Sequence, residues 1–231
     1  HARTMERNYA DPSSRQLSVK TTRELENHYR NGIGIRLGPT IELSKGIYPE
    51  GNGGLDITGG VLADVIVAPA LSLETGIKYI HRFYEVSDIT ELSRLSLPGV
   101  DDDLGTLMYA DIDSWMFELP LNLKYRYPLS MTRHLLAGLG YSSLLYSKQV
   151  FEYGYQVENN PNVSLTSDFK SNEFRFYAGA VNISLGFSNQ LKNRKILETA
   201  IYYQHSLGKL GQEGTRPAFL GVKAVYWFSI R

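Results

Sequence analysis

The segment Trp115–Tyr127 constrains the fold of this chain more than any other. Its residues fall into two alternating sets, because successive side chains of a β-strand point to opposite faces. One face is wholly apolar with aromatic tips and consists of Trp115, Phe117, Leu119, Leu121, Leu123, Tyr125 and Tyr127. The other face is mostly polar and consists of Met116, Glu118, Pro120, Asn122, Lys124 and Arg126. An apolar outside and a charged inside are typical of a transmembrane β-barrel, which meets lipid outside and encloses a polar interior.

The composition narrows the classes of function. Among 231 residues, 24 basic and 24 acidic side chains give a formal net charge of zero, which argues against a nucleic-acid-binding protein. Sixteen tyrosines suit a protein with many side chains at a membrane–water interface. The absence of cysteine excludes a thiol nucleophile and a Cys-type zinc site. No motif indicates a cofactor or a bound metal, so we expect neither.

The same alternation recurs along the chain and predicts eight strands. They lie at about 31–43, 57–67, 71–79, 115–127, 135–142, 174–187, 196–205 and 218–230. The polar segments Ser44–Asp56, Arg82–Asp113 and Ser147–Asn172 are expected to be loops, with short turns at 68–70, 128–133 and 189–193. The apolar face changes phase near Ala180, which predicts a β-bulge.

An even number of strands, with short turns alternating with long loops, is typical of outer-membrane barrels. The predicted fold is therefore all-β, an eight-stranded antiparallel up-and-down transmembrane β-barrel over residues 31–231. Residues 1–30 are expected to form a polar periplasmic N-terminal segment, and both termini are expected in the periplasm. A precursor bound for the bacterial outer membrane is expected to have carried a secretory signal ahead of His1.

The polar faces of these strands carry charges of both signs. The predicted lumen set is Arg36, Glu42, Asp64, Glu74, Lys78, Glu118, Lys124, Arg126, Arg175, Glu198 and Lys223. The interior of an eight-stranded barrel is just filled by side chains, and buried charges persist when they are paired. We therefore interpret the set as a structural, salt-bridged plug; an ion or proton pathway is the alternative.

Two other groups of residues invite a functional interpretation. The segment Arg82–Asp113 holds eight acids and two bases, including Asp101, Asp102 and Asp103, and is predicted to be a solvated external contact loop. Calcium binding is the alternative, although the spacing fits no known calcium loop. His205 and Ser206 near Glu198 could suggest a hydrolase, but in the predicted register Glu198 faces the lumen and His205 faces lipid. No catalytic residues are therefore predicted, and the chain is expected not to be an enzyme.

Several segments resemble a known family. Phe117–Tyr127, with Glu-Leu-Pro-Leu-Asn-Leu-Lys-Tyr inside it, is similar to a strand of the small outer-membrane β-barrel proteins of Bacteroidota, the PorT-like group. Ala137–Ser143 and Leu73–Tyr79 fit the same pattern, and the resemblance extends from Asn31 to the C-terminus. The chain departs from many outer-membrane strands at its end, which reads Phe228-Ser-Ile-Arg231 rather than closing on an aromatic residue.

The resemblance implies a role in protein secretion, gliding or envelope signalling, and it carries over no catalytic residue. We expect a non-enzymatic outer-membrane anchor or accessory subunit of an envelope assembly, with outer-membrane lipid and an envelope protein as partners and no nucleic acid. The alternatives are a narrow transporter of small hydrophobic solutes, and surface adhesion or binding through the long external loops. A soluble β-sandwich is the competing fold, and it would bury the apolar face of Trp115–Tyr127.

Overall fold

The computed structural model describes residues 34–49, 51–68, 70–157, 164–172, 174–191 and 195–230. The predicted N-terminal segment 1–30 lies outside these residues. The strands are β1 (Ile35–Tyr48), β2 (Gly51–Ala68), β3 (Leu71–Val86), β4 (Thr106–Pro128), β5 (Arg133–Gln156), β6 (Ser164–Ser171), β7 (Arg175–Gln190), β8 (Ile196–Ser206) and β9 (Ala218–Ile230). Between β3 and β4 lie the short helix α2 (Ile89–Leu92) and a 3₁₀ turn at Asp102–Leu104. None of the helices in the described part of the chain is long and apolar enough to span a membrane.

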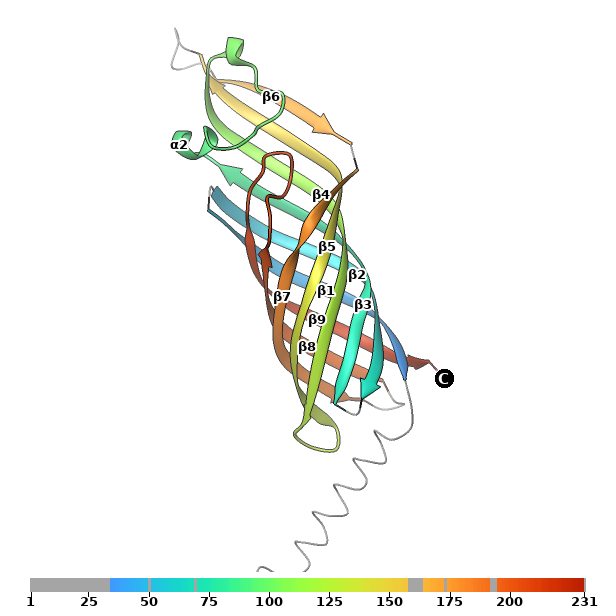
Figure 1. Ribbon diagram of the computed structural model, residues 1–231. Coiled ribbons are helices and arrows are strands. Elements are labelled where there is room, and N and C mark those ends of the chain that lie inside the picture. The colour runs from blue at the N-terminus through green and yellow to red at the C-terminus, as the bar shows by residue number, and fades with distance from the viewer. Residues whose placement is uncertain are drawn as a thin grey trace, which may run out of the picture.

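The strands close into a ring. All pairings around the ring are antiparallel, and its order is β1, β2, β3, β4, β5, β7, β8 and β9. The ring closes where β9 pairs with β1. The ring therefore has eight strands, and β6 lies outside it, paired with the upper part of β5 (Figure 1). This confirms the predicted eight-stranded antiparallel barrel.

The outer face of the wall is exposed and the inner face is buried, as the alternation predicts. On β4, Leu119 and Leu121 are about half exposed on the outside, whereas Glu118 and Lys124 are buried inside. A soluble sandwich would reverse this arrangement, so the sandwich alternative was wrong. Aromatic residues flank the outer apolar belt on β4, with Trp115 and Phe117 at one end and Tyr125 and Tyr127 at the other, as in a transmembrane barrel with interfacial girdles.

The strands extend much further than the alternation suggested. The predicted loop Ser44–Asp56 was wrong, because β1 and β2 stay paired up to Tyr48 and Gly51. The predicted loop Arg82–Asp113 shortens to residues 87–105, and Ser147–Asn172 contains the end of β5 and all of β6. With 23 residues in β4 and a rise of about 3.3 Å per residue, this strand is more than twice as long as a hydrocarbon core of about 30 Å is thick.

The reason for this difference is that the polar and apolar faces of β4 exchange at Trp115. Above Trp115, the outward face of β4 carries Asp111 and Asp113, and its inward face carries the fully buried Ala110 and Ile112. The alternation continues, but its polar and apolar faces exchange, because the outer solvent changes from lipid to water. Polarity on the outward face therefore resembles a loop in sequence while the strand continues.

The wall has the predicted bulge. Ser142 pairs with Ala180, whereas Leu144 pairs with Tyr177, so β7 has one extra residue at this point. The backbone N–H of Gly179 donates to the Tyr141 hydroxyl at 3.0 Å, and the Leu207 N–H donates to the Gly179 carbonyl. The prediction near Ala180 is confirmed, and the bulge is sealed by hydrogen bonds on both sides.

Candidate functional site

The lower half of the lumen is organised around one lysine. The Lys124 Nζ lies 2.8 Å from Glu198, 2.9 Å from Glu74 and 3.4 Å from Asp64. It also lies 4.6 Å from the centre of the fully buried Trp227 ring. These groups come from five different strands of the ring, so the cluster joins opposite walls across the barrel axis.

Further bases surround the same carboxylates. Arg126 lies 2.6 Å from Asp64 and 3.4 Å from Glu198, and Arg36 lies 3.6 Å from Asp64. Lys223 lies 3.0 Å from Glu74. Buried ions are tolerated when hydrogen-bonded partners compensate for the loss of water, and each of these three carboxylates has more than one basic partner.

A second layer lies above the first. Lys78 sits between Glu42 and Glu118, at 3.1 and 3.0 Å. Glu118 also accepts hydrogen bonds from the Ser142 hydroxyl and the Gln204 amide. The space left among these side chains is about 20 Å³, which is room for about one water molecule. The described lumen therefore offers a packed polar core at this level.

The structure thus places ten of the eleven predicted lumen residues inside the barrel. Arg175 is the exception, because it is exposed at the upper end of β7 rather than buried among the others. The bulge at Gly179 separates Arg175 from the spanning part of β7, and it lies beyond the level of the two buried layers. Arg175 lies opposite the buried Tyr146, so it is on the inward face as predicted, but it is exposed and does not belong to the two buried layers.

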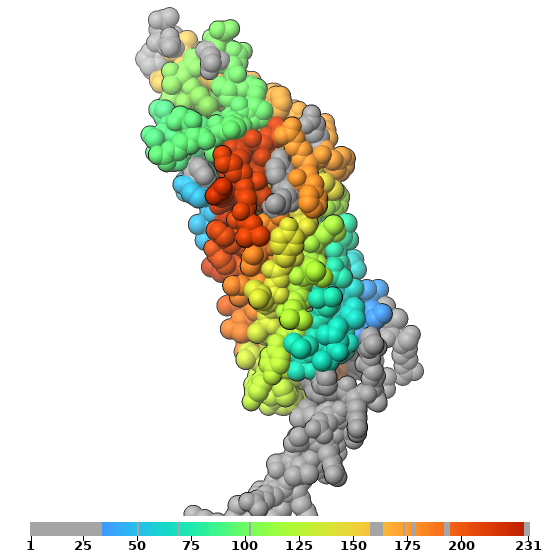
Figure 2. All heavy atoms as spheres, in the orientation of Figure 1, coloured from blue at the N-terminus to red at the C-terminus, as the bar shows by residue number. Residues whose placement is uncertain are grey.

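The upper mouth of the barrel is filled by the segment 207–217, which joins β8 to β9. Leu210 is fully buried against Ile80, Met116, Leu144 and Tyr146. In Figure 2 the red atoms of this part of the chain lie directly beneath the green atoms of the segment 87–105. The segment therefore forms a mouth plug, the name used below for residues 207–217.

Polar groups hold the mouth plug in place. Glu213 is 3% exposed and accepts a hydrogen bond from the Gln149 amide at 3.0 Å. The Gln149 side-chain oxygen in turn accepts from the Gln212 backbone N–H, and the Ser96 N–H donates to the Glu213 carbonyl. Burial raises the pKa of Glu213 above its ordinary value. Glu213 and Gln149 were not predicted from the sequence, because nothing local indicates that a Gly-rich loop turns back into the barrel.

Above the mouth, the extended strands enclose an apolar core of their own. Phe151, Tyr153 and Tyr155 of β5 are buried there, together with Tyr84 and Ile112. The segment 87–105 covers this core through its partly buried Leu95, Leu97, Val100 and Leu104. The predicted external loop is thus a packed lid on a projecting sheet.

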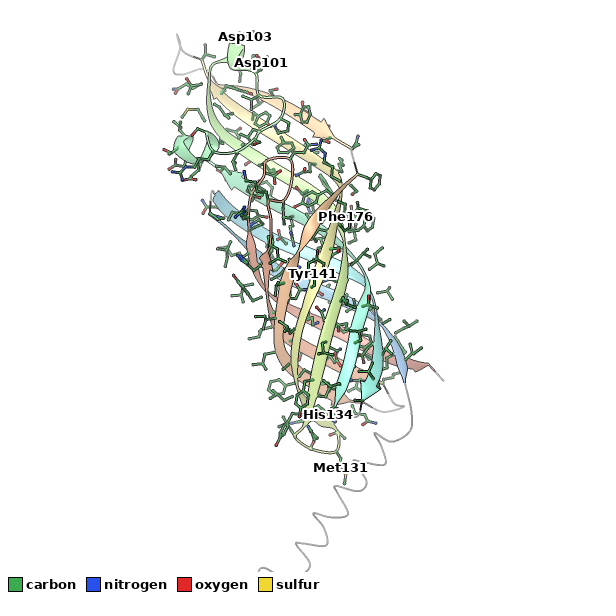
Figure 3. The ribbon with its side chains drawn as sticks, viewed as in Figure 1. Asp101, Asp103, Met131, His134, Tyr141 and Phe176 are labelled. Atoms are coloured by element: carbon green, nitrogen blue, oxygen red, sulfur yellow. The ribbon has the colours of Figure 1, made fainter. Side chains whose placement is uncertain are left out.

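The acidic run of that lid lies at the far tip of the molecule (Figure 3). Asp101 and Asp103 are exposed, and the Asp101 carboxylate accepts the Asp103 backbone N–H at 3.0 Å. The side chain of Asp102 lies outside the described part of the structure. Among the described residues, no group of three or more His, Cys, Asp or Glu side chains is arranged to hold a metal ion.

The possible hydrolase residues do not converge. His205 is exposed on the outer wall, where its Nδ1 lies 3.4 Å from the Tyr203 hydroxyl. Ser206 and Glu198 are buried on the inner side, and Glu198 belongs to the ion pairs around Lys124. A second histidine that sequence analysis did not single out, His81, lies 2.9 Å from Asp113 on the outer face. Pairing of β3 with β4 brings His81 and Asp113 together, and no spacing in the sequence indicates this contact.

A hollow of about 510 Å³ lies on the outer wall of the barrel. Its lining comes from β5, β7, β8, β9 and β1 and includes Leu135, Phe187, Thr199, Ile201 and Ala224. Thr199 and Ala224 are smaller than their neighbours, so the outer surface of the wall is recessed at these two positions. Because most of its lining belongs to the outer apolar belt, this hollow faces lipid.

No protein-family model matches this chain, and no curated protein matches it. Among solved structures, Neisserial surface protein A (NspA) is 12% identical, with a TM-score of 0.44 over 84% of this chain and 97% of that chain. Ail, the attachment invasion locus protein of Yersinia pestis, is 10% identical, with a TM-score of 0.33 over 85% and 97%. The outer membrane protease OmpT from Escherichia coli is 10% identical, with a TM-score of 0.43 over 86% and 96%.

At such identities a likeness concerns the fold alone, and a shared fold does not carry activity or partners with it. The expectation that this chain is not an enzyme therefore stays a prediction. The resemblance to the PorT-like group likewise stays an interpretation of the sequence.

Proposed function

We propose that this chain is a non-enzymatic outer-membrane barrel that acts as an anchor or accessory subunit of an envelope assembly. The observation that carries the proposal is the filled interior. Two layers of paired charges leave about 20 Å³ of space between them, and the mouth plug covers their upper side. A barrel filled in this way supplies a rigid membrane anchor rather than a general pore.

The projecting sheet supports the same proposal. β3, β4, β5 and β6 extend past the apolar belt and carry a buried aromatic core. Ordering so much chain outside the membrane costs conformational entropy, which the apolar core and the lid offset. A rigid surface held at a fixed height above the membrane suits protein–protein contact. The resemblance to the PorT-like group favours secretion or envelope signalling as the process.

The test is capture of the intact protein from its native membrane. Outer membranes are solubilised in mild detergent, the chain is captured by a C-terminal tag, and co-purifying proteins are identified. A partner in fixed stoichiometry is the expected result, and its identity would name the process. A barrel that elutes alone from native membranes, across several mild detergents, would contradict the proposal.

Surface adhesion is a second candidate, and the projecting sheet is the observation that favours it. Deleting residues 93–103 from the lid would then lower binding of cells to surfaces, whereas an anchor role predicts no change. Transport of small solutes is less well supported, because the bulge at Gly179 is hydrogen-bonded on both sides. Single-channel current above the noise level from purified protein would favour transport.

A further inference from the structure

The outermost strand of the projecting sheet has one unpaired edge. β6 pairs with β5 along its whole length, from Gln149 opposite Ser171 to Gln156 opposite Ser164. No other described strand pairs with β6, and Figure 1 shows it at the border of the sheet. Alternate backbone N–H and C=O groups of an edge strand point away from the sheet and can pair with another chain.

Natural edge strands are usually short, bulged, covered or interrupted by proline. β6 has eight residues, no proline and no register shift against β5. Its Leu165 is 40% exposed, and Phe169, on the same face, packs against the aromatic core of the projecting sheet. The edge is therefore regular enough to accept a further strand.

A row of four acids ends at this edge. Glu85 of β3 lies opposite Asp111 of β4, Asp111 lies opposite Glu152 of β5, and Glu152 lies opposite Asp168 of β6. Residues directly opposite in antiparallel strands share a face and have Cβ atoms about 5 Å apart. The four carboxylates thus form one line across the outer face of the sheet.

Such a line costs stability, because like charges directly opposite one another repel. Partial burial and the neighbouring Glu85 and Glu152 carboxylates raise the pKa of Asp111. One buried oxygen of Asp111 has no hydrogen-bond partner in the described structure. At the edge itself, Lys170 lies 2.6 Å from Asp168, and both side chains are well exposed. A base on the same face is thus already the neighbour of the last acid.

We propose that β6 accepts an extended segment of a partner protein by strand addition, and that the segment carries a basic residue opposite Asp168 and apolar residues on its other face. A Lys or Arg opposite Asp168 would continue the line of acids with a positive charge. The apolar residues between would lie beside Leu165 and Phe169 and extend the aromatic core. Main-chain hydrogen bonds would supply affinity and the two faces specificity, as in other cases of β-strand addition. The inference rests on the proposed anchor function and adds the chemistry of the contact.

A second copy of this chain fits the edge less well in the register centred on Asp168. Antiparallel pairing of two β6 strands centred on Asp168 would bring Asp168 opposite its own copy and join two acidic lines on one face. This arrangement doubles the repulsion instead of relieving it. A register centred on Phe169 would instead set Asp168 opposite Lys170 of the other copy, so a β6-paired dimer of the chain in nanodiscs without peptide would count against the basic partner segment that we propose as the occupant.

The test uses the full chain in lipid nanodiscs and synthetic ten-residue peptides. One peptide alternates Val with Ser and carries a single central Lys in place of a Ser, and its matched control carries Glu at the same position. We expect the basic peptide to bind and to slow amide hydrogen exchange in residues 164–171 by at least about tenfold, whereas the acidic peptide does neither. Unchanged exchange in β6 at saturating basic peptide, or equal binding of both peptides, would overturn the proposal.

Backbone pairing and charge are tested separately. N-methylating every second peptide residue removes the donors from one edge, so one of the two possible alternations is expected to abolish binding while the other retains it. The Asp168→Asn variant is expected to bind the basic peptide about two- to fivefold more weakly, the range expected for one cross-strand ion pair. Asp103→Asn, which removes an exposed acid from the lid, is the matched control and should bind normally. Equal weakening by both variants, or no effect of either N-methylation, would mean diffuse attraction and would overturn strand addition.

Failure here and failure of the anchor proposal give different results. A partner captured from native membranes without protection of β6 places the contact elsewhere on the anchor. Peptide binding at β6 with no partner in native membranes would contradict the anchor role and would still support the binding site at the edge of β6.

Discussion

Lys124 is the residue on which the interior depends most directly. It is 3% exposed and lies within 3.4 Å of Asp64, Glu74 and Glu198. Removing its charge leaves three buried carboxylates with fewer partners, and breaking a buried ion pair in this way costs about 3–5 kcal/mol.

We therefore expect Lys124→Met to lower the free energy of unfolding by about that amount. The measurement is urea unfolding in lipid vesicles, followed by tryptophan fluorescence. Lys209→Met is the matched control, because Lys209 is exposed and lies in the mouth plug outside the buried layers. Equal stability of the two variants would mean that the lumen charges are not tightly coupled.

Glu213 gives the mouth plug a pH dependence. Its pKa is raised by burial, so the folded state binds the proton more tightly than the unfolded state. Stability from this group is then greatest at low pH and falls as the pH rises from the ordinary range of a glutamate through the raised value.

The Glu213→Gln variant removes this titration while keeping an oxygen that can accept from Gln149. The free energy of unfolding of the unmodified protein is expected to fall relative to that of Glu213→Gln across this pH window. Asp103→Asn, at an exposed position of the lid, is the control variant. A difference between the unmodified protein and Glu213→Gln that does not change with pH would contradict the assignment.

At the scale of elements, the bulge of β7 has a specific sequence requirement. A Cβ atom on Gly179 would collide with the backbone carbonyl oxygen of Ser142 on the neighbouring strand. Backbone cannot move aside as a flexible side chain can, and overpacking of this kind costs about 1–3 kcal/mol.

Gly179→Ala is expected to lower the free energy of unfolding by that amount and to reduce the fraction of folded barrel after refolding into detergent. Gly59→Ala provides the control, because a Cβ atom at this strand position meets nothing within 4 Å. Folded and unfolded forms are separated by gel mobility without boiling. The same yield from both variants would show that β7 passes the bulge without needing glycine.

The elements also show where local patterns suffice. The phase change near Ala180 predicted the bulge, because one extra residue shifts every later side chain to the other face. The extensions of β4 and β5 were missed, because Asp111 and Glu152 occupy the face that carries apolar residues lower in the wall. Polar residues on the outward face resemble a loop in sequence, whereas here they mark the passage of a continuing strand from lipid into water.

At the scale of the whole molecule, the outer belt provides a test of the membrane environment. Leu121 of β4 is 51% exposed and Ile89 of α2 is 56% exposed, so the two side chains are almost equally accessible. They differ in their surroundings, because Leu121 lies in the middle of the belt and Ile89 on the projecting part.

Leu121→Arg is expected to cost about 2–4 kcal/mol, the range for an arginine facing the middle of a bilayer. Ile89→Arg should be close to neutral, because its side chain meets water. Both values come from urea unfolding in the same vesicles. Similar costs for the two variants would contradict the placement of the belt in lipid.

The sequence by itself determined the strands of the membrane-spanning wall, the face that each of their residues occupies and the polar character of the interior. These follow from a period of two and from the contrast between lipid and a polar lumen, which are both local properties. Only the tertiary structure decided that Lys124 meets Glu198, 74 residues away, that the mouth plug turns inward, and that four acids line up across β3 to β6. Those contacts depend on strand register and on closure of the ring, and these arise from pairing between strands that are distant in sequence.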